Sequence, residues 1–287
     1  AAETAKKTFD SGVWSNASVD DRKTVLLAIK DLIVENKEEI AEQEVMNTGA
    51  PITQAYGRQI PRSAMNFEFF AEFISQASSP VFDQNPDYIT YVRREPIGVA
   101  GLIAPWNAPM ALATMKIAGA IAFGNSCVLK PSELTPLTAL ILGELSLKAK
   151  FPEGVFNIIN GEPRVIGEIL CKNSNVKKIT FTGSTKVGKL LMTNSSDTVK
   201  NISLELGGNA PFIVFEDADL SEALEGLINA KFRNAGQTCI SANRIFIHKN
   251  ISDEFLSLVI KKIKRLKVGN GLLNPDLGPL ISKEALS

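Results

Sequence analysis

The chain has 287 residues, of which 45% are hydrophobic and 22% charged, and its 31 basic and 31 acidic side chains give no net charge. This balance excludes a largely disordered chain and gives no indication of a nucleic-acid-binding protein. No apolar run reaches the roughly 20 residues of a membrane-spanning helix, and a single histidine without zinc-finger spacing excludes a histidine-rich metal site.

The cysteines indicate the cellular compartment of the protein, and the chain ends indicate whether the sequence is part of a longer one. Cys127, Cys171 and Cys239 are odd in number and far apart, which predicts free thiols and a cytoplasmic protein. At roughly 150 residues per domain, the length predicts two domains. Because the sequence starts at Ala1 without a methionine and stops just after a turn-rich segment, we expect it to be a piece of a longer protein.

The first third of the chain is predicted to be helical. Ser18 is a candidate N-cap, apolar side chains recur at helical spacing from Val25 to Ile40, and Gly49 ends that helix. A second helix is expected over residues 52–76. Helix-breaking residues follow, and the β-branched and aromatic segment 88–92 then predicts a strand.

From Ile97 onward, strand patterns alternate with helix patterns. Strands are expected at 99–104, 126–129, 155–159, 178–181 and 201–204, and helices at 110–123, 136–150, 164–171 and 185–193. After Gly207 a second unit begins, with strands at 212–215 and 244–248 and helices at 221–232 and 251–266. This alternation predicts an α/β fold with a Rossmann-like, mostly parallel sheet and helices on both faces.

Five short motifs lie at or just after predicted strand ends, the place where open parallel sheets bind ligands. They are Ala104–Asn107, Lys130–Glu133, Phe181–Gly188, Glu205–Pro211 and Gly236–Cys239. Each one alone also has an ordinary interpretation, such as a helix cap, a solvated loop or strand-end carboxylate, or a small buried thiol. Their shared position at strand ends favours one common crevice.

The side chains of these motifs have complementary chemistry. A thiolate at Cys239 is a strong nucleophile, and a strand-end carboxylate at Glu205 can act as a general base. The Asn107 amide can donate a hydrogen bond to a developing oxyanion. N–H groups at the helix start after Gly183 can bind phosphate, and Glu133 can accept hydrogen bonds from a ribose diol while repelling a 2′-phosphate.

In this order and at this spacing, the motifs resemble those of the aldehyde dehydrogenase superfamily over essentially the whole chain. The resemblance implies that Cys239 attacks the aldehyde carbonyl, that Asn107 and the Cys239 N–H hold the oxyanion, and that Glu205 activates the water that hydrolyses the thioester. It implies NAD as the cofactor, with NADP as the alternative. The implied cofactor contacts are Ile103, Trp106, Lys130, Glu133, Gly183, Ser184, Thr185, Gly188, Leu206 and Gly207.

The resemblance also implies a domain organisation. Residues 1–206 would form the dinucleotide-binding domain, interrupted by a protruding β oligomerisation ribbon at about 77–96, and residues 207–287 would form the first part of a second α/β catalytic domain. Members of the superfamily are longer than this chain. We therefore expect a homodimer or homotetramer of the full-length protein and an isolated chain without activity.

The substrate is a weaker inference. Lys231–Asn234 and Ile240–Arg244 resemble succinate-semialdehyde dehydrogenases, whereas Ile60–Ser63 and Asn66–Phe70 resemble the hydroxymuconic-semialdehyde branch. Both branches oxidise aldehydes that carry a remote carboxylate. Arg233 and Arg244 are the candidate anchors for that carboxylate, and a structural ion pair is the alternative for each. The expected partner is a small aldehyde, without nucleic-acid or membrane partners.

Two other functions stay open. One is an acylating relative that passes the thioester to coenzyme A, against which Glu205 argues, because that branch usually lacks the water-activating carboxylate. The other is a non-enzymatic binding or structural protein on the same scaffold, such as a lens crystallin relative. The presence of both Cys239 and Glu205 argues against it for the whole protein, but not for the isolated chain.

Overall fold

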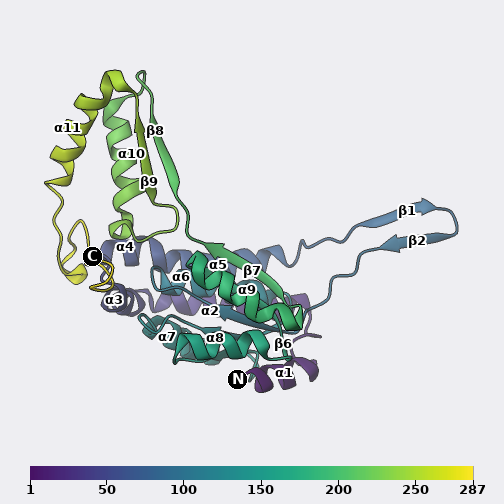
Figure 1. Cartoon of the computed structure of the whole chain (residues 1–287). Coiled ribbons are helices and arrows are strands. Elements are labelled where there is room, and N and C mark those ends of the chain that lie inside the picture. The colour runs from purple at the N-terminus through teal and green to yellow at the C-terminus, as the bar shows by residue number, and fades with distance from the viewer. Residues whose placement is uncertain (287) are drawn as a thin grey trace.

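The chain begins with three helices in the computed structural model, which describes residues 1–286 (Figure 1). They are α1 (Ala2–Asp10), α2 (Val19–Glu35) and α3 (Lys37–Thr48). The Ser18 hydroxyl accepts the Asp21 N–H at 3.1 Å and Asp21 in turn accepts the Ser18 N–H, so α2 begins with a capping box.

The prediction of a single helix up to Gly49 is wrong, because two helices, α2 and α3, occupy this segment. Asn36 leaves helical geometry (φ −99°, ψ 21°), and its side-chain amide donates to the carbonyl of Leu32 at 2.7 Å. Asparagine competes in this way with the backbone for hydrogen bonds, so the helical segment is divided into α2 and α3. Gly49, at φ +75°, ends α3 as expected.

The second expected helix is also interrupted. It consists of α4 (Ile52–Gln54), a π-helical turn (Ala55–Gln59) and α5 (Ile60–Phe73). Pro61 explains the wide turn, because proline has no N–H to donate to the carbonyl four residues earlier and its ring would clash there. The π turn accommodates this and presents Tyr56, Gly57 and Arg58 to solvent.

A two-stranded antiparallel ribbon follows α5 and projects away from the rest of the molecule (Figure 1). It consists of β1 (Val81–Asn85) and β2 (Tyr88–Tyr91). The sequence predicted only the second strand, since β1 contains Asp83, Gln84 and Asn85, which disfavour strands. Val81, Ile89 and Tyr91 are each about two-thirds exposed, so the ribbon carries apolar side chains without covering them.

The central sheet has five parallel strands in the order β5-β4-β3-β6-β7, which confirms the predicted Rossmann-like fold. The strands are β3 (Val99–Ile103), β4 (Ser126–Lys130), β5 (Phe156–Ile158), β6 (Val176–Gly183) and β7 (Asn201–Leu206). The helices between them are α6 (Pro109–Ala122), α7 (Leu137–Lys148), α8 (Pro163–Lys172) and α9 (Thr185–Ser195), the last followed by a 3-10 turn (Ser196–Thr198).

Alternating side chains of this sheet enter two different cores. Ala100, Leu102 and Leu129 pack into the larger core with α2, α5, α6 and α7. Val99, Val128 and Ile179 face the other way, into a core with α1, α8 and α9. Because strand side chains point alternately to opposite faces, apolar residues on both faces require helices on both sides, as predicted.

A second, smaller sheet stands at one end of the molecule (Figure 1). It pairs β8 (Ala210–Val214) in parallel with β9 (Ala242–Ile247), and it packs on α10 (Leu220–Phe232) and α11 (Ser252–Ile263) around Val214, Leu227 and Phe255. Short 3-10 turns lie at Arg233–Gly236, Lys249–Ile251 and Gly271–Leu273.

The C-terminal segment returns to the first unit. A side-chain carbon at Gly278 would lie 1.8 Å from the carbonyl oxygen of Gly49, so this position admits only glycine. Thr53 also donates a hydrogen bond to Asn274 at 2.7 Å. Across residues 1–286, every helix is too short or too polar to cross a bilayer.

Candidate active site

The carboxyl ends of four parallel strands meet at one edge of the central sheet. Ile103 at the end of β3 is paired with Lys130 of β4 and with Phe181 of β6, and Gly183 of β6 is paired with Leu206 of β7. This register brings four of the five motifs to one edge. It is the edge at which open parallel sheets bind nucleotides.

Cys239 reaches this edge from a different direction than predicted. It does not follow a strand but precedes β9, in the loop after α10. β8 and β9 are parallel and paired from Ala210 and Ala242 onward, so Cys239 lies at the amino end of the second sheet. Because β8 continues the chain only four residues after the end of β7, this amino end faces the carboxyl end of the first sheet.

Close contact between backbones joins the Cys239 and Glu205 motifs. A side-chain carbon at Gly208 would lie 3.1 Å from the Cys239 carbonyl oxygen, and Asn243 donates to the Gly208 carbonyl at 3.5 Å. Glycine at position 208 therefore allows the strand end that carries Glu205 to approach the cysteine loop. The Cys239 thiol is exposed, whereas those of Cys127 and Cys171 are buried, and burial raises the pKa of both buried thiols.

The loop before Cys239 has an unusual backbone. Asn234, Ala235 and Gly236 all have left-handed φ values, of 53°, 55° and 79°. Such a conformation is costly for residues with a Cβ and persists only where surrounding contacts impose it. Here the Asn234 amide group donates to the carbonyls of Asn107 (3.1 Å) and Gln237 (3.2 Å), and the Gln237 N–H donates to the Asn234 carbonyl at 3.0 Å.

Asn107 is held against this loop. Its side-chain amide nitrogen donates to the Gln237 carbonyl at 3.0 Å, and its side-chain oxygen is buried with no hydrogen-bond partner among the described residues. The amide carries a second N–H, and within residues 1–286 nothing accepts the Cys239 N–H. Asn107 and the cysteine loop that it contacts thus each offer an N–H group, and an oxyanion site requires such donors.

Glu205 lies on the sheet face covered by α6, where it lines a cavity of about 330 Å³ with Lys116 and Thr180. Lys116 is only 7% exposed and donates to the Thr180 hydroxyl at 3.1 Å. Burial lowers the pKa of Lys116 to about 8, and the nearby Glu205 carboxylate opposes this shift. Lys116 is not among the predicted site residues, although a lone charge within the apolar stretch 108–123 was a usable signal.

Lys130 and Glu133 form an ion pair with an N–O distance of 2.5 Å. The Lys130 side chain is 5% exposed and that of Glu133 46% exposed, so the alternative of a freely solvated loop pair does not hold for Lys130. Burial alone would raise the pKa of Glu133, but the hydrogen bond and charge of Lys130, with a backbone amide, lower it below its ordinary value. A fixed carboxylate therefore lies next to the end of β4.

The turn between β6 and α9 has the form expected for a helix N-terminus. Ser184 is the N-cap, accepting the Val187 N–H at 3.3 Å, and Thr185 is the first helical residue. At Gly188 a side-chain carbon would lie 2.8 Å from Leu206, so α9 packs directly on β7. The Ser184 hydroxyl is used as a cap, which leaves the first backbone N–H groups of α9 for a phosphate.

The remaining predicted positions lie around the same edge. Ile103 and Trp106 are half-buried at and after the end of β3, and Gly207 is exposed with open space around it. Thr182, near the end of β6, has a buried hydroxyl without a partner among residues 1–286. A glycine with open space, an unpartnered hydroxyl and a fixed carboxylate along one edge fit a dinucleotide.

The two candidate anchor arginines differ. Arg244 lies exposed on β9, where its guanidinium donates to the Asn209 carbonyl at 3.0 Å. Arg233 instead lines a cavity of about 180 Å³ together with Asn107 and Thr238, next to Cys239. Within the described part of the chain, neither arginine has an acid within ion-pair distance.

These features define an α/β protein in which a nucleotide-type sheet edge faces an exposed cysteine. A model of the aldehyde dehydrogenase family matches residues 1–287. The chain is 44% identical to the mitochondrial succinate-semialdehyde dehydrogenase of Oryza sativa subsp. japonica over 288 residues, which is 100% of this chain and 54% of that protein. The chain belongs to the aldehyde dehydrogenase family.

Solved structures of aldehyde dehydrogenases are similar to this chain. An aldehyde dehydrogenase from Brucella melitensis biovar abortus 2308 has a TM-score of 0.94 and 42% identity, over 100% of this chain and 60% of that one. A betaine aldehyde dehydrogenase from Staphylococcus aureus in complex with NAD+ has a TM-score of 0.96 and 36% identity, over 99% of this chain and 56% of that one. The chain spans about half the length of the curated relatives it matches.

Proposed function

We propose that the protein containing this chain oxidises an aldehyde to a carboxylic acid with NAD and water, yielding NADH. The observation that carries the proposal is the contact between three motifs. Asn107 is hydrogen-bonded to the cysteine loop at 3.0 Å, and Gly208, three residues after Glu205, approaches the Cys239 carbonyl. A nucleophile, an oxyanion donor and a base thus come from three separate segments.

Cys239 is the proposed nucleophile. Its thiolate adds to the aldehyde carbon, and the carbonyl π electrons move to the oxygen, which becomes an oxyanion. The second N–H of the Asn107 amide and the Cys239 N–H hold that oxyanion, as preorganised dipoles that need no rearrangement during the reaction. When bound, NAD supplies the acceptor for the hydride that leaves the carbon, and a thioester on Cys239 remains.

Glu205 is the proposed base for the second half of the reaction. It takes a proton from a water molecule as the water oxygen attacks the thioester carbon, and the carbon–sulfur bond breaks to restore the thiolate. The buried side chain of Lys116 lies on the same sheet face and lines the same cavity as Glu205. The proton then leaves to solvent.

The cofactor would lie along the strand ends. Lys130 and Glu133 would hold the adenosine ribose, and the start of α9 after Gly183, with Ser184 and Thr185, the pyrophosphate. Trp106, Ile103, Leu206 and Gly207 would border it, and Gly188 would keep α9 close to the sheet. The Glu133 carboxylate favours NAD over NADP, because it would repel a 2′-phosphate.

The substrate, assembly and location are further parts of the proposal. A carboxylate at the far end of the aldehyde would bind Arg233, whose cavity adjoins Asn107 and Thr238. The dinucleotide-binding domain would comprise residues 1–206 and the catalytic domain would start at 207. The exposed apolar ribbon of β1 and β2 would pair with another subunit of a homodimer or homotetramer in the cytoplasm.

The test uses the intact protein, purified and assayed for aldehyde-dependent NADH formation with a panel of semialdehydes. Cys239→Ala is expected to abolish turnover, whereas Cys171→Ala, which removes a buried thiol far from the edge, is the matched control. Turnover that survives Cys239→Ala would contradict the proposal. Acyl-coenzyme A formation on addition of coenzyme A would instead identify the acylating alternative.

A further inference from the structure

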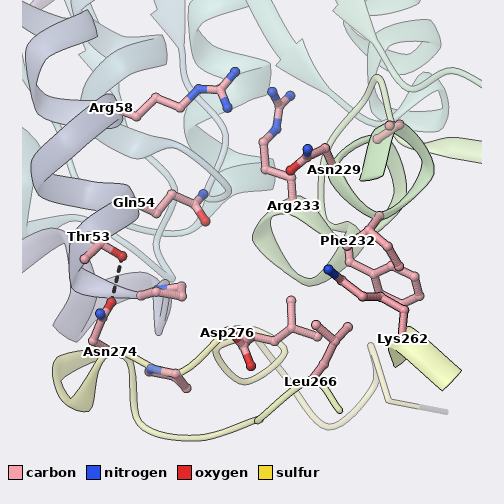
Figure 2. A pocket seen from close by; sticks show the side chains of 16 residues that line it. Thr53, Gln54, Arg58, Asn229, Phe232, Arg233, Lys262, Leu266, Asn274 and Asp276 are labelled. Carbon is pink, nitrogen blue, oxygen red and sulfur yellow. Dashed lines mark hydrogen bonds between the residues drawn. The ribbon is translucent and has the colours of Figure 1, made fainter. Parts of the chain in front are cut away.

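Two cavities adjoin beside the cysteine loop. The inner one, of about 180 Å³, reaches Asn107 and Thr238, and the outer cleft, of about 970 Å³, opens between α4, the π turn, α10 and the 274–277 segment (Figure 2). Gln54, Arg58 and Arg233 line both. These three side chains therefore stand where the outer cleft meets the space next to Cys239.

Positive charge gathers at this junction without a matching acid. Figure 2 shows the guanidinium groups of Arg58 and Arg233 on the same side of the cleft, with Asp276 on the other side. Arg62 lines the inner cavity. Across residues 1–286, none of the three arginines has an acid within ion-pair distance.

The other charged groups of the cleft are already engaged. Asp276 accepts the Lys267 N–H at 2.8 Å, and Lys262 is paired with Glu225 at 2.5 Å. Burial lowers the pKa of Arg233, and the charge of Arg58 lowers it further, because the two cations repel each other across the junction. An anion between them would remove this repulsion and satisfy two planar, fork-shaped donors.

Arg58 occupies its position because of the local backbone. It belongs to the π-helical turn 55–59, which Pro61 imposes at the start of α5. Ala55 and Gln59 of this turn are buried, while Arg58 is exposed to the cleft. π-helical turns often occur at functional sites, and here the turn directs a cation toward the mouth of the substrate cavity.

We propose that Arg58 and Arg233 together bind the anionic group at the far end of the aldehyde, so that Arg58 is a second specificity-determining residue of the site. The inference rests on the proposed function, with the aldehyde carbon beside Asn107 and Cys239 and the anion at the junction. Arg62, on α5, adds positive potential along the inner cavity. Arg244 has no part in this subsite.

The test compares two four-carbon aldehydes in the intact enzyme: succinate semialdehyde, which has a terminal carboxylate, and butanal, which has none. Loss of one hydrogen-bonded charge pair lowers binding about ten- to a hundredfold. Arg58→Gln and Arg233→Gln are each expected to reduce kcat/KM for succinate semialdehyde by this factor, mainly through KM. The kcat/KM for butanal is expected to change less than threefold in both variants. Arg265 is exposed and lies outside both cavities, so Arg265→Gln is the control and should change kcat/KM for either aldehyde less than threefold.

A second readout does not depend on turnover. Succinate is expected to slow the alkylation of Cys239 by iodoacetamide in the wild type, and not in Arg58→Gln. A drop in kcat/KM of equal size for both aldehydes, or no drop for either, would overturn the role of Arg58. A wild-type enzyme that forms no NADH with any aldehyde would refute the proposed function instead, so the two failures are distinguishable.

Discussion

Glu44 on α3 offers a sharp test of how the first unit is held together. Its side chain is fully buried, and one carboxyl oxygen accepts the Met110 N–H at 3.4 Å. Met110 lies in the first turn of α6, three residues after Asn107. Glu44 therefore ties α3 to the helix that starts beside the oxyanion donor.

The size of the effect of Glu44 on folding stability follows from its pKa. Burial raises the pKa of Glu44 from 4.5 to about 7, and its hydrogen bonds offset this only in part. The native carboxyl thus binds its proton more tightly than the unfolded chain does. Its effect on stability is most favourable below pH 4.5 and is lost as the pH rises toward 7. With ~1.4 kcal/mol per tenfold change in proton affinity, ionisation costs the fold on the order of 3 kcal/mol.

The assay is urea unfolding, followed by the fluorescence of Trp14, which is buried in the same core. Glu44→Gln keeps the acceptor for Met110 and removes the ionisable group. We expect it to match the wild type at pH 4, below the unfolded pKa, and to exceed its free energy of unfolding by about 3 kcal/mol at pH 8.5. Glu42→Gln, on the exposed side of the same helix, is the control. A difference between Glu44→Gln and wild type that is the same at both pH values would show that ionisation of Glu44 does not destabilise the fold.

Three further predictions concern the site and its support. In single-turnover assays, the rate of the hydrolytic step is expected to show an inflection near pH 8, where Lys116 loses its charge. Lys116→Met should remove this inflection. A pH profile that Lys116→Met leaves unchanged would show that Lys116 does not influence hydrolysis. Glu133→Gln should raise kcat/KM for NADP relative to NAD by about tenfold, and a constant ratio would separate Glu133 from cofactor choice. Gly278→Ala should lower the free energy of unfolding by about 1 to 3 kcal/mol, since its Cβ would meet the Gly49 carbonyl; equal denaturation midpoints would contradict that contact.

The sheet and its helices were predictable because their signals are local. Strands such as Val99–Ile103 and Ser126–Lys130 are short apolar runs bounded by turn residues, and βαβ connections restrict how such runs can pair. The breaks at Asn36 and Pro61 were missed because helical spacing of apolar residues continues across them. Only the competing side-chain bond of Asn36 and the missing N–H of Pro61 divide those helices.

The site was predictable as a set of motifs and not as an arrangement. Cys239 was expected after a strand end, yet it precedes β9, because proximity to Gly208 depends on how the second sheet meets the first. The convergence of Arg58 with Arg233 joins residues far apart in the sequence through a π turn, and no local pattern encodes that. Lys116 was different, since an isolated charge in an apolar helix already indicates a buried partner.

The separate roles of Cys239 and Glu205 can be read from the mass of the intact Glu205→Gln enzyme after mixing with aldehyde and NAD. If Cys239 is the nucleophile and Glu205 the base, one equivalent of NADH forms rapidly, and peptide mapping finds the acyl group on the peptide containing Cys239. Steady turnover without an acylated cysteine, or an acyl group on Cys127 or Cys171, would contradict the account.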